Sequence, residues 1–225
     1  MSTAAQWDNM VAYQTPDFAG FKVYAQYAMG SNDNENESRS DRYYALGATY
    51  NNGPFAGYFA VDSINYATAD ANGALPNASD IDDSLTVTLG GSYDFEAVKV
   101  YLGAQYFDEV KLSNFKGVIK AAGVGQSNKV KGYGISLTGD APVLGGKAMF
   151  GIGYTDAESA DSEDKTADVE LQRYVVSVGY DYPFSKRTDV YAVASYMQDS
   201  WEDKVNKQDA DPSAYTLYVG LRHRF

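Results

Sequence analysis

Charged side chains recur at alternate positions of segments that otherwise read as β-strands. In the last eleven residues, Arg222 and Arg224 fall on one face, while Leu221 and Phe225 fall on the other, because alternate side chains of a strand point to opposite faces. Fixed charges on the polar face of a sheet could line a water-filled passage and select ions by sign. The candidates that share this placement are Lys22, Lys99, Lys147, Arg173, Arg222, Arg224, Asp94, Asp140 and Asp181.

Each of these residues could instead have a structural role, because each could form an ion pair with an opposite charge on a neighbouring strand. For Arg222 and Arg224, two residues apart on one face, we favour the pore-lining role. The excess of cations on strand faces predicts a mild anion preference. Acidic loops would attract cations to the mouth, so the sequence leaves the net selectivity open.

Eleven segments have strand character, and they alternate strictly between short turns and long polar connections. Pro16–Gly20 and Asn51–Pro54 have turn chemistry, set by proline, glycine and asparagine. The predicted strands are 7–15, 21–29, 42–50, 55–66, 84–95, 98–107, 131–140, 147–155, 173–182, 188–198 and 215–225. Alternating short and long connections are typical of up-and-down hairpins in an outer-membrane barrel.

The apolar face of these strands repeatedly ends in Tyr or Phe, as a lipid-facing surface requires at its two interfaces. We therefore expect an all-β fold, an antiparallel up-and-down transmembrane β-barrel that forms one domain over residues 1–225. A soluble lipocalin-like barrel would turn its apolar face inward and needs about eight strands. A soluble Greek-key sandwich is the plainer alternative.

Composition excludes several other classes. The chain has no cysteine, which rules out disulfides, zinc-thiolate sites and a cysteine nucleophile. Its net charge of −12 disfavours nucleic acid as a partner. No apolar run reaches the length of a transmembrane helix. The first five residues lack the basic region and apolar core of a signal peptide. If the protein is exported, we expect the sequence to be its mature or trimmed form.

Enzymatic and metal-binding functions find little support. Serine–histidine catalysis needs a histidine base, and the only histidine, His223, is predicted to face lipid. The acidic runs 32–37 and 161–164 offer oxygen ligands for calcium but lack the EF-hand spacing. Solvated external loops explain these runs better, and we expect neither a cofactor nor a metal.

Residues 182–191 read YPFSKRTDVY, and residues 219–225 end in a phenylalanine. These two C-terminal motifs resemble a short turn and strand, and the terminal strand, of the Gram-negative general porins. Residues 7–13 and 17–21 resemble, more weakly, the strand that follows the family's constriction loop. Ala12 stands where the family usually has an arginine.

The resemblance implies a channel in the bacterial outer membrane for passive diffusion of ions and small hydrophilic solutes. It also implies contact with outer-membrane lipids, a homotrimer, and a terminal Phe225 that the outer-membrane assembly machinery reads as an insertion signal. The family has sixteen strands, so the chain is expected to match the last eleven. The alternative is a truncated or structural barrel protein without an open channel.

Overall fold

The fold is a single antiparallel β-sheet. The computed structural model describes residues 7, 9–29, 42–66, 83–111, 129–160 and 168–225. The strands are β1 (Met10–Gln14), β2 (Phe21–Ala28), β3 (Arg42–Asn52), β4 (Phe55–Asn65), β5 (Ser84–Asp94), β6 (Lys99–Lys111), β7 (Lys129–Val143), β8 (Gly146–Ser159), β9 (Val169–Pro183), β10 (Thr188–Asp203), β11 (Gln208–Ala210) and β12 (Ser213–His223). Within these ranges, no helix is long and apolar enough to cross a membrane.

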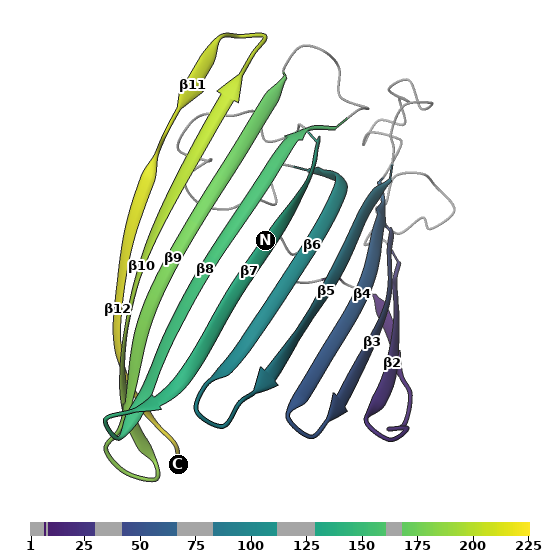
Figure 1. Cartoon of the computed structure of the whole chain (residues 1–225). Coiled ribbons are helices and arrows are strands. Elements are labelled where there is room, and N and C mark those ends of the chain that lie inside the picture. The colour runs from purple at the N-terminus through teal and green to yellow at the C-terminus, as the bar shows by residue number, and fades with distance from the viewer. Residues whose placement is uncertain (1–6, 8, 30–41, 67–82, 112–128, 161–167) are drawn as a thin grey trace.

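The strands follow one another in up-and-down order. Each strand from β1 to β10 pairs antiparallel with the next, and β12 pairs with β10. The five short turns gather at one end of the sheet, and the long connections leave from the other end (Figure 1). The predicted all-β, antiparallel up-and-down architecture is therefore confirmed.

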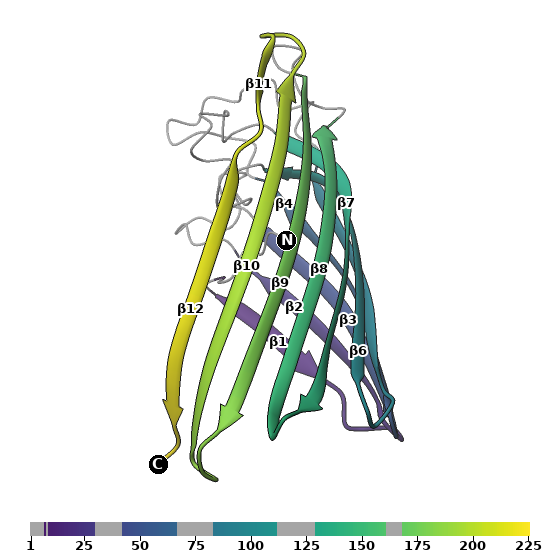
Figure 2. The ribbon, with the colours of Figure 1, turned by 60° about the vertical axis from the view of Figure 1, so that its left-hand side comes forward.

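The sheet is curved like part of a barrel wall, and its two edges are not paired with each other in the described part of the chain (Figure 2). Nine antiparallel pairings lead from β1 to β10 and one more leads to β12. Because that number is even, β1 and β12 run in the same direction. These two strands could close the wall on themselves only through a parallel pairing.

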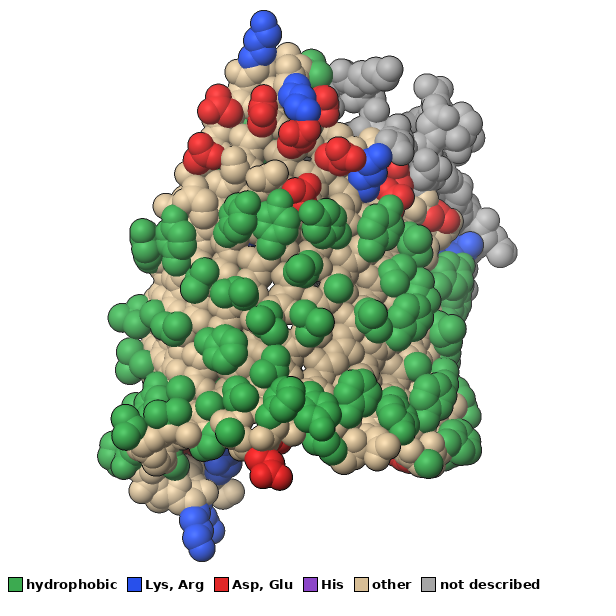
Figure 3. Space-filling view, viewed as in Figure 1, with side chains coloured by type: hydrophobic (Ala, Val, Ile, Leu, Met, Phe, Trp, Pro, Cys, Tyr) green, Lys and Arg blue, Asp and Glu red, His purple; other side chains and the backbone are tan. Residues whose placement is uncertain are grey.

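The outer face is apolar and is bounded by two rows of aromatic rings. Figure 3 shows hydrophobic side chains over the body of this face, with charged side chains toward both ends. On β9, Tyr174 and Tyr182 mark the two rows. Eight residues span about 27 Å along a strand, and a tilt of roughly 40° reduces this to about 21 Å, close to the ~25 Å apolar band of outer-membrane barrels.

Neighbouring rings within each row are in contact. In the row toward the long connections, Tyr154 and Tyr174 have centroids 4.8 Å apart, and the Tyr196–Tyr215 pair has the same separation. In the row toward the short turns, Tyr93 and Phe95 lie 4.6 Å apart. Tyrosine rings prefer the membrane interface because they combine an apolar body with a polar hydroxyl group.

Beyond the tyrosine row that lies toward the long connections, the alternation of apolar and polar side chains along the strands inverts. Val169 and Leu171 of β9 are buried on the inner face, whereas Glu170 and Gln172 are exposed on the outer face. A cluster of buried side chains forms there, made of Phe107, Val110, Val130, Ala157, Val169, Leu171 and Trp201. These strand ends therefore have the amphipathicity of a sheet that stands in water, not in lipid.

This inversion explains why several strands are longer than the sequence predicts. The sequence predicts one acidic loop over 156–172, yet β8 continues to Ser159 and β9 begins at Val169. A bulge between Phe107 and Val110 of β6 likewise turns Val110 to the inner face, opposite Val130. Exposed polar residues on the outer face give these stretches the composition of loops.

The predicted loop 201–214 contains the short strand β11, which forms a hairpin with the end of β10. The carboxylate of Asp203 accepts hydrogen bonds from the Asn206 side chain and from the backbone N–H groups of Val205 and Asn206. These hydrogen bonds, led by the one from the Asn206 amide, lower the pKa of Asp203. The hairpin is thus closed by a carboxylate that stays ionised.

Two inner-face tyrosines lie flat against the wall over glycines. A Cβ atom at Gly90 would lie 2.5 Å from the Tyr58 ring, which is its partner across β4 and β5. Tyr191 covers Gly220 in the same way across β10 and β12. The glycines serve here for close packing, which keeps the rings out of the space enclosed by the sheet.

We predict that Gly90→Val destabilises the fold by about 1–3 kcal/mol, because the new side chain must displace the Tyr58 ring. The matched control is Gly153→Val, also on the inner face, where the nearest atom to an added Cβ is 3.8 Å away. The measurement is reversible urea unfolding from lipid vesicles. Equal losses for both variants would contradict the packing role of Gly90.

Candidate functional site: the inner face of the sheet

The inner face is polar and mostly carries small side chains. Cross-strand pairs there include Gly103–Ser136 of β6 and β7 and Gly151–Ser177 of β8 and β9. Ser177 and Ser195 share a hydrogen bond of 2.8 Å between their hydroxyl oxygens. A face of this kind suits contact with water, in contrast to the apolar outer face of the same strands.

A belt of alternating charges crosses the inner face near the short turns. Register places Lys99 beside both Asp94 and Asp140, Lys147 beside Asp181, and Asp189 beside Arg222. The basal charge belt consists of Asp94, Lys99, Asp140, Lys147, Asp181, Asp189, Arg222 and Arg224. It contains four cations and four carboxylates, so its formal charge is zero.

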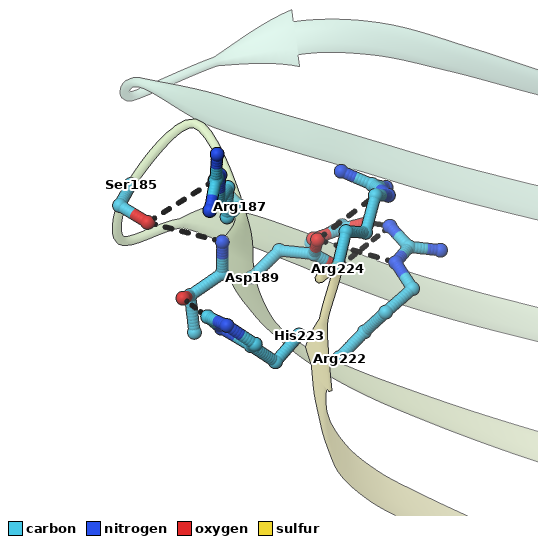
Figure 4. Close-up of polar contacts among 8 residues, drawn as sticks. Ser185, Arg187, Asp189, Arg222, His223 and Arg224 are labelled. Carbon is cyan, nitrogen blue, oxygen red and sulfur yellow. Dashed lines mark hydrogen bonds and ion pairs between the residues drawn. The ribbon is translucent and has the colours of Figure 1, made fainter.

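Arg222 of β12 and Arg224, which follows the end of that strand, form the densest part of the belt (Figure 4). An Arg222 guanidinium nitrogen lies 2.6 Å from one oxygen of Asp189 and 3.1 Å from an oxygen of Asp181. Arg224 approaches Asp189 at 3.5 Å. Asp189 is almost buried, with 7% of its side chain exposed. The carboxylate is therefore neutralised by two cations, as a buried charge requires.

The turn between β9 and β10 positions this cluster. The Ser185 hydroxyl accepts hydrogen bonds from the backbone N–H groups of Arg187 and Thr188, as Figure 4 shows. The Arg224 N–H donates to the Arg187 carbonyl, which ties the terminal strand to the turn. The Ser-Lys-Arg-Thr sequence thus fixes the start of β10, and with it Asp189.

In the other half of the belt, on β5 to β8, the charged groups make longer contacts. Lys147 lies 4.0 Å from Asp140, whose carboxylate also accepts a hydrogen bond of 3.0 Å from the Tyr101 hydroxyl. The Lys99 ammonium lies 5.5 Å from the centre of the Tyr101 ring, within range of a cation–π contact. Asp94 caps the adjoining turn by accepting the Glu96 N–H at 2.8 Å.

From β7 to the end of the chain, the cations of the belt are more exposed than its carboxylates, whereas at the other end of the belt Asp94 is exposed and Lys99 is half-buried. The side chains of Lys147, Arg222 and Arg224 are 51%, 50% and 59% exposed. Those of Asp140 and Asp181 are 23% and 19% exposed, and Asp189 is lower still. A solute at this part of the inner face would therefore meet ammonium and guanidinium groups first, although the formal charges of the belt balance.

Two predicted pore-lining cations lie outside the belt. Arg173 makes a two-point ion pair with Asp199, with N–O distances of 2.7 and 2.8 Å. The side chains are 12% and 0% exposed, which makes this pair part of the wall. Lys22 lies 3.6 Å from Asp17 at the first short turn and is partly exposed.

Sequence reasoning missed Asp189 and Asp199 as site residues. Both lie at inner-face positions of β10, directly opposite an arginine of a neighbouring strand. The alternation along 188–198 would have identified Asp189 once the partner strand was known. Asp199 lies one residue past the predicted end of that strand.

The sequence also offered a histidine and two acidic runs as candidates for catalysis or metal binding. His223 lies on the outer face, 2.9 Å from the Thr188 hydroxyl, and its ring packs against the exposed Phe225. Among the residues with described coordinates, no group of three His, Cys, Asp or Glu side chains could hold a metal ion. The acidic runs 32–37 and 161–164 lie outside the described residues.

An apolar outer face between aromatic rows and a polar, charged inner face define a segment of transmembrane barrel wall. A family model described as Gram-negative porin matches residues 1–201. The chain therefore belongs to the Gram-negative porin family.

Named relatives agree with this assignment. The chain is 29% identical to an outer membrane porin protein of Bordetella pertussis, over 98% of this chain and 58% of that protein. It is 26% identical to outer membrane porin protein 32 of Delftia acidovorans, over 97% and 56% of the two chains. The chain thus spans somewhat more than half the length of these relatives.

Solved structures share the fold. The anion-selective porin from Comamonas acidovorans matches 97% of this chain and 60% of its own, with a TM-score of 0.66 and 22% identity. OmpT of Vibrio cholerae covers 95% of this chain and 64% of its own, with a TM-score of 0.61 and 15% identity. At these identities the likeness bears on the fold alone.

We predict that Asp199→Asn lowers the free energy of unfolding by about 3–5 kcal/mol, because it leaves the Arg173 guanidinium buried without its counter-charge. The matched control is Asp17→Asn, which removes the carboxylate of an exposed pair and should change stability by less than about 1 kcal/mol. Urea unfolding from lipid vesicles measures both. A small loss for Asp199→Asn would contradict a structural role for this pair.

Proposed function

We propose that the chain forms part of the wall of a water-filled outer-membrane channel, through which ions and small hydrophilic solutes diffuse passively. The observation that carries this proposal is the opposite character of the two faces of the same strands. Leu102 and Ile152 are exposed on the outer face, whereas the inner face presents hydroxyls, glycines and the basal charge belt. The outer membrane is the location that this arrangement and the family suit.

We infer a preference for anions in such a channel. From β7 to the end of the chain, the exposed groups of the basal charge belt are the cations Lys147, Arg222 and Arg224, and the carboxylates that they contact are less exposed. At the other end of the belt, Asp94 is an exposed carboxylate. Ions are selected by the charges that they meet at close range. Arg222 and Arg224 are the strongest pore-lining candidates, followed by Lys147, Lys99 and Lys22, with Asp94 and Asp181 as their counter-charges. Arg173 contributes mainly to the wall.

We propose that residues 1–225 are one wall segment, equivalent to the last eleven strands of a sixteen-stranded porin. Since β1 and β12 run in the same direction, antiparallel closure needs an odd number of further strands. Five such strands would bring the wall to sixteen and cover both edges. Unpaired edges are costly in lipid, so the closed form is the functional one in this proposal.

The proposed partners follow from the same surfaces. The apolar outer face contacts outer-membrane lipid, and the family suggests a homotrimer. Phe225 is fully exposed at the end of the terminal strand, where outer-membrane assembly machinery could bind it. Catalysis is not part of the proposal, since His223 is on the outer face and bonded to Thr188.

A structural barrel protein without an open channel is the competing function. The buried apolar cluster at the ends of β6 to β10 favours it, because this cluster lies on the inner face near one mouth. The glycine and serine wall below the cluster favours an open passage. Conductance separates the two functions.

We predict discrete, ion-permeable conductance when the folded protein is reconstituted in planar bilayers under a salt gradient. Replacing Arg222 and Arg224 with Ser should shift the reversal potential toward cations, because two exposed positive charges leave the inner face. The matched control is Lys186→Ser with Arg187→Ser, which removes two positive charges from the exposed short turn.

Folded protein whose wall is closed but which does not conduct would support the structural function. A reversal potential that is unchanged by the Arg222 and Arg224 substitutions, or changed equally by the control, would remove these arginines from the pore-lining role.

A further inference from the structure

An apolar groove interrupts the polar inner face of β7 to β10. Its side walls are Met149 of β8, Val175 of β9 and Val193 of β10, all at positions that face inward with Ser177 and Gly151. Elsewhere on the described inner face, most mid-strand positions carry polar, small or tyrosine side chains, such as Thr88 and Gln105. Met197 of β10, opposite Val175, is a further apolar residue beside the groove. Three neighbouring apolar side chains on a wall that faces water form a surface on which an apolar ligand could pack.

Glycines shape the floor of this groove. A Cβ atom at Gly179 would lie 3.1 Å from both the Met149 methyl group and a Val193 methyl group. Gly151 continues the floor on β8, next to Thr138 of β7. The resulting volume is about 330 Å³, at the lower end of the ~300–1,000 Å³ that small-molecule sites occupy.

The groove ends at the basal charge belt. Lys147 lies two residues from Met149 on the same face of β8, and Asp181 lies two residues from Gly179 on β9. Arg222 reaches the same place, because it contacts Asp181 at 3.1 Å. Since Lys147 and Arg222 are about half exposed, positive charge borders the apolar surface.

We propose that this groove binds a small amphipathic carboxylate. The apolar body lies against Met149, Val175 and Val193, and the carboxylate contacts the exposed nitrogens of Lys147 and Arg222. Charge-assisted contacts to a carboxylate are among the stronger polar contacts available. The inference rests on the proposed function, since it requires a water-filled inner face, and it names the class of solute that would be retained there.

Equilibrium binding tests the proposal without any need for current. The folded protein in lipid nanodiscs is titrated with phenylacetate and followed by saturation-transfer NMR, with empty nanodiscs subtracted. Acetate lacks the apolar body and benzyl alcohol lacks the charge, so both should bind at least about tenfold more weakly than phenylacetate.

Substitutions locate the site. Gly179→Leu fills the groove and should weaken phenylacetate binding at least about tenfold. Val193→Ser replaces an apolar side chain of the groove by a small polar one and should weaken phenylacetate binding about threefold or more. Lys147→Gln should weaken binding about threefold to tenfold. The matched control is Lys22→Gln, an inner-face cation outside the belt, which should leave binding unchanged.

Absence of saturable phenylacetate binding would overturn the proposal, whether the groove is empty or is filled by another part of the chain or by a second copy. Equal binding of benzyl alcohol, or full binding by a folded Gly179→Leu or Val193→Ser variant, would also overturn it. Binding with the expected pattern by a protein that does not conduct would support the groove while refuting the proposed channel.

Discussion

Backbone hydrogen bonding in a lipid environment is the constraint on which the rest of this structure depends. Each peptide group within the membrane must pair inside the protein, and strands satisfy this only by pairing edge to edge. Once the strands are paired in register, the two-residue repeat assigns every side chain to lipid or to the inner face. The aromatic rows, the glycine floors and the basal charge belt all follow from that assignment.

Charge on the inner face obeys a second constraint, because a buried ion needs a counter-ion. Asp189 and Asp199 are nearly inaccessible, and each is matched by an arginine directly across the sheet. The two pairs differ in one respect. Arg173 is covered together with its partner, whereas Arg222 keeps half of its side chain exposed. One arrangement stabilises the wall, and the other also presents a cation to solutes.

The sequence was sufficient for the architecture, since the alternation and the order of short and long connections predict the sheet and its eleven wall strands. The ends of β9 and β10 were missed because beyond the tyrosine row the apolar residues turn inward, as Leu171 and Trp201 do. The site was only half predictable. Alternation placed Arg222 on the inner face, but which carboxylates it contacts depends on register between strands distant in sequence, as with Asp181.

The most direct test of the account is a single-cysteine scan along residues 174–181 of β9, which is possible because the chain has no cysteine of its own. The folded variants in lipid vesicles are treated with a water-soluble thiol reagent and with a lipid-soluble one. We predict that positions 175, 177, 179 and 181 react with the water-soluble reagent, and that the even positions react only with the lipid-soluble one. Reactivity without a two-residue period, or with the two classes exchanged, would contradict the assignment of the faces.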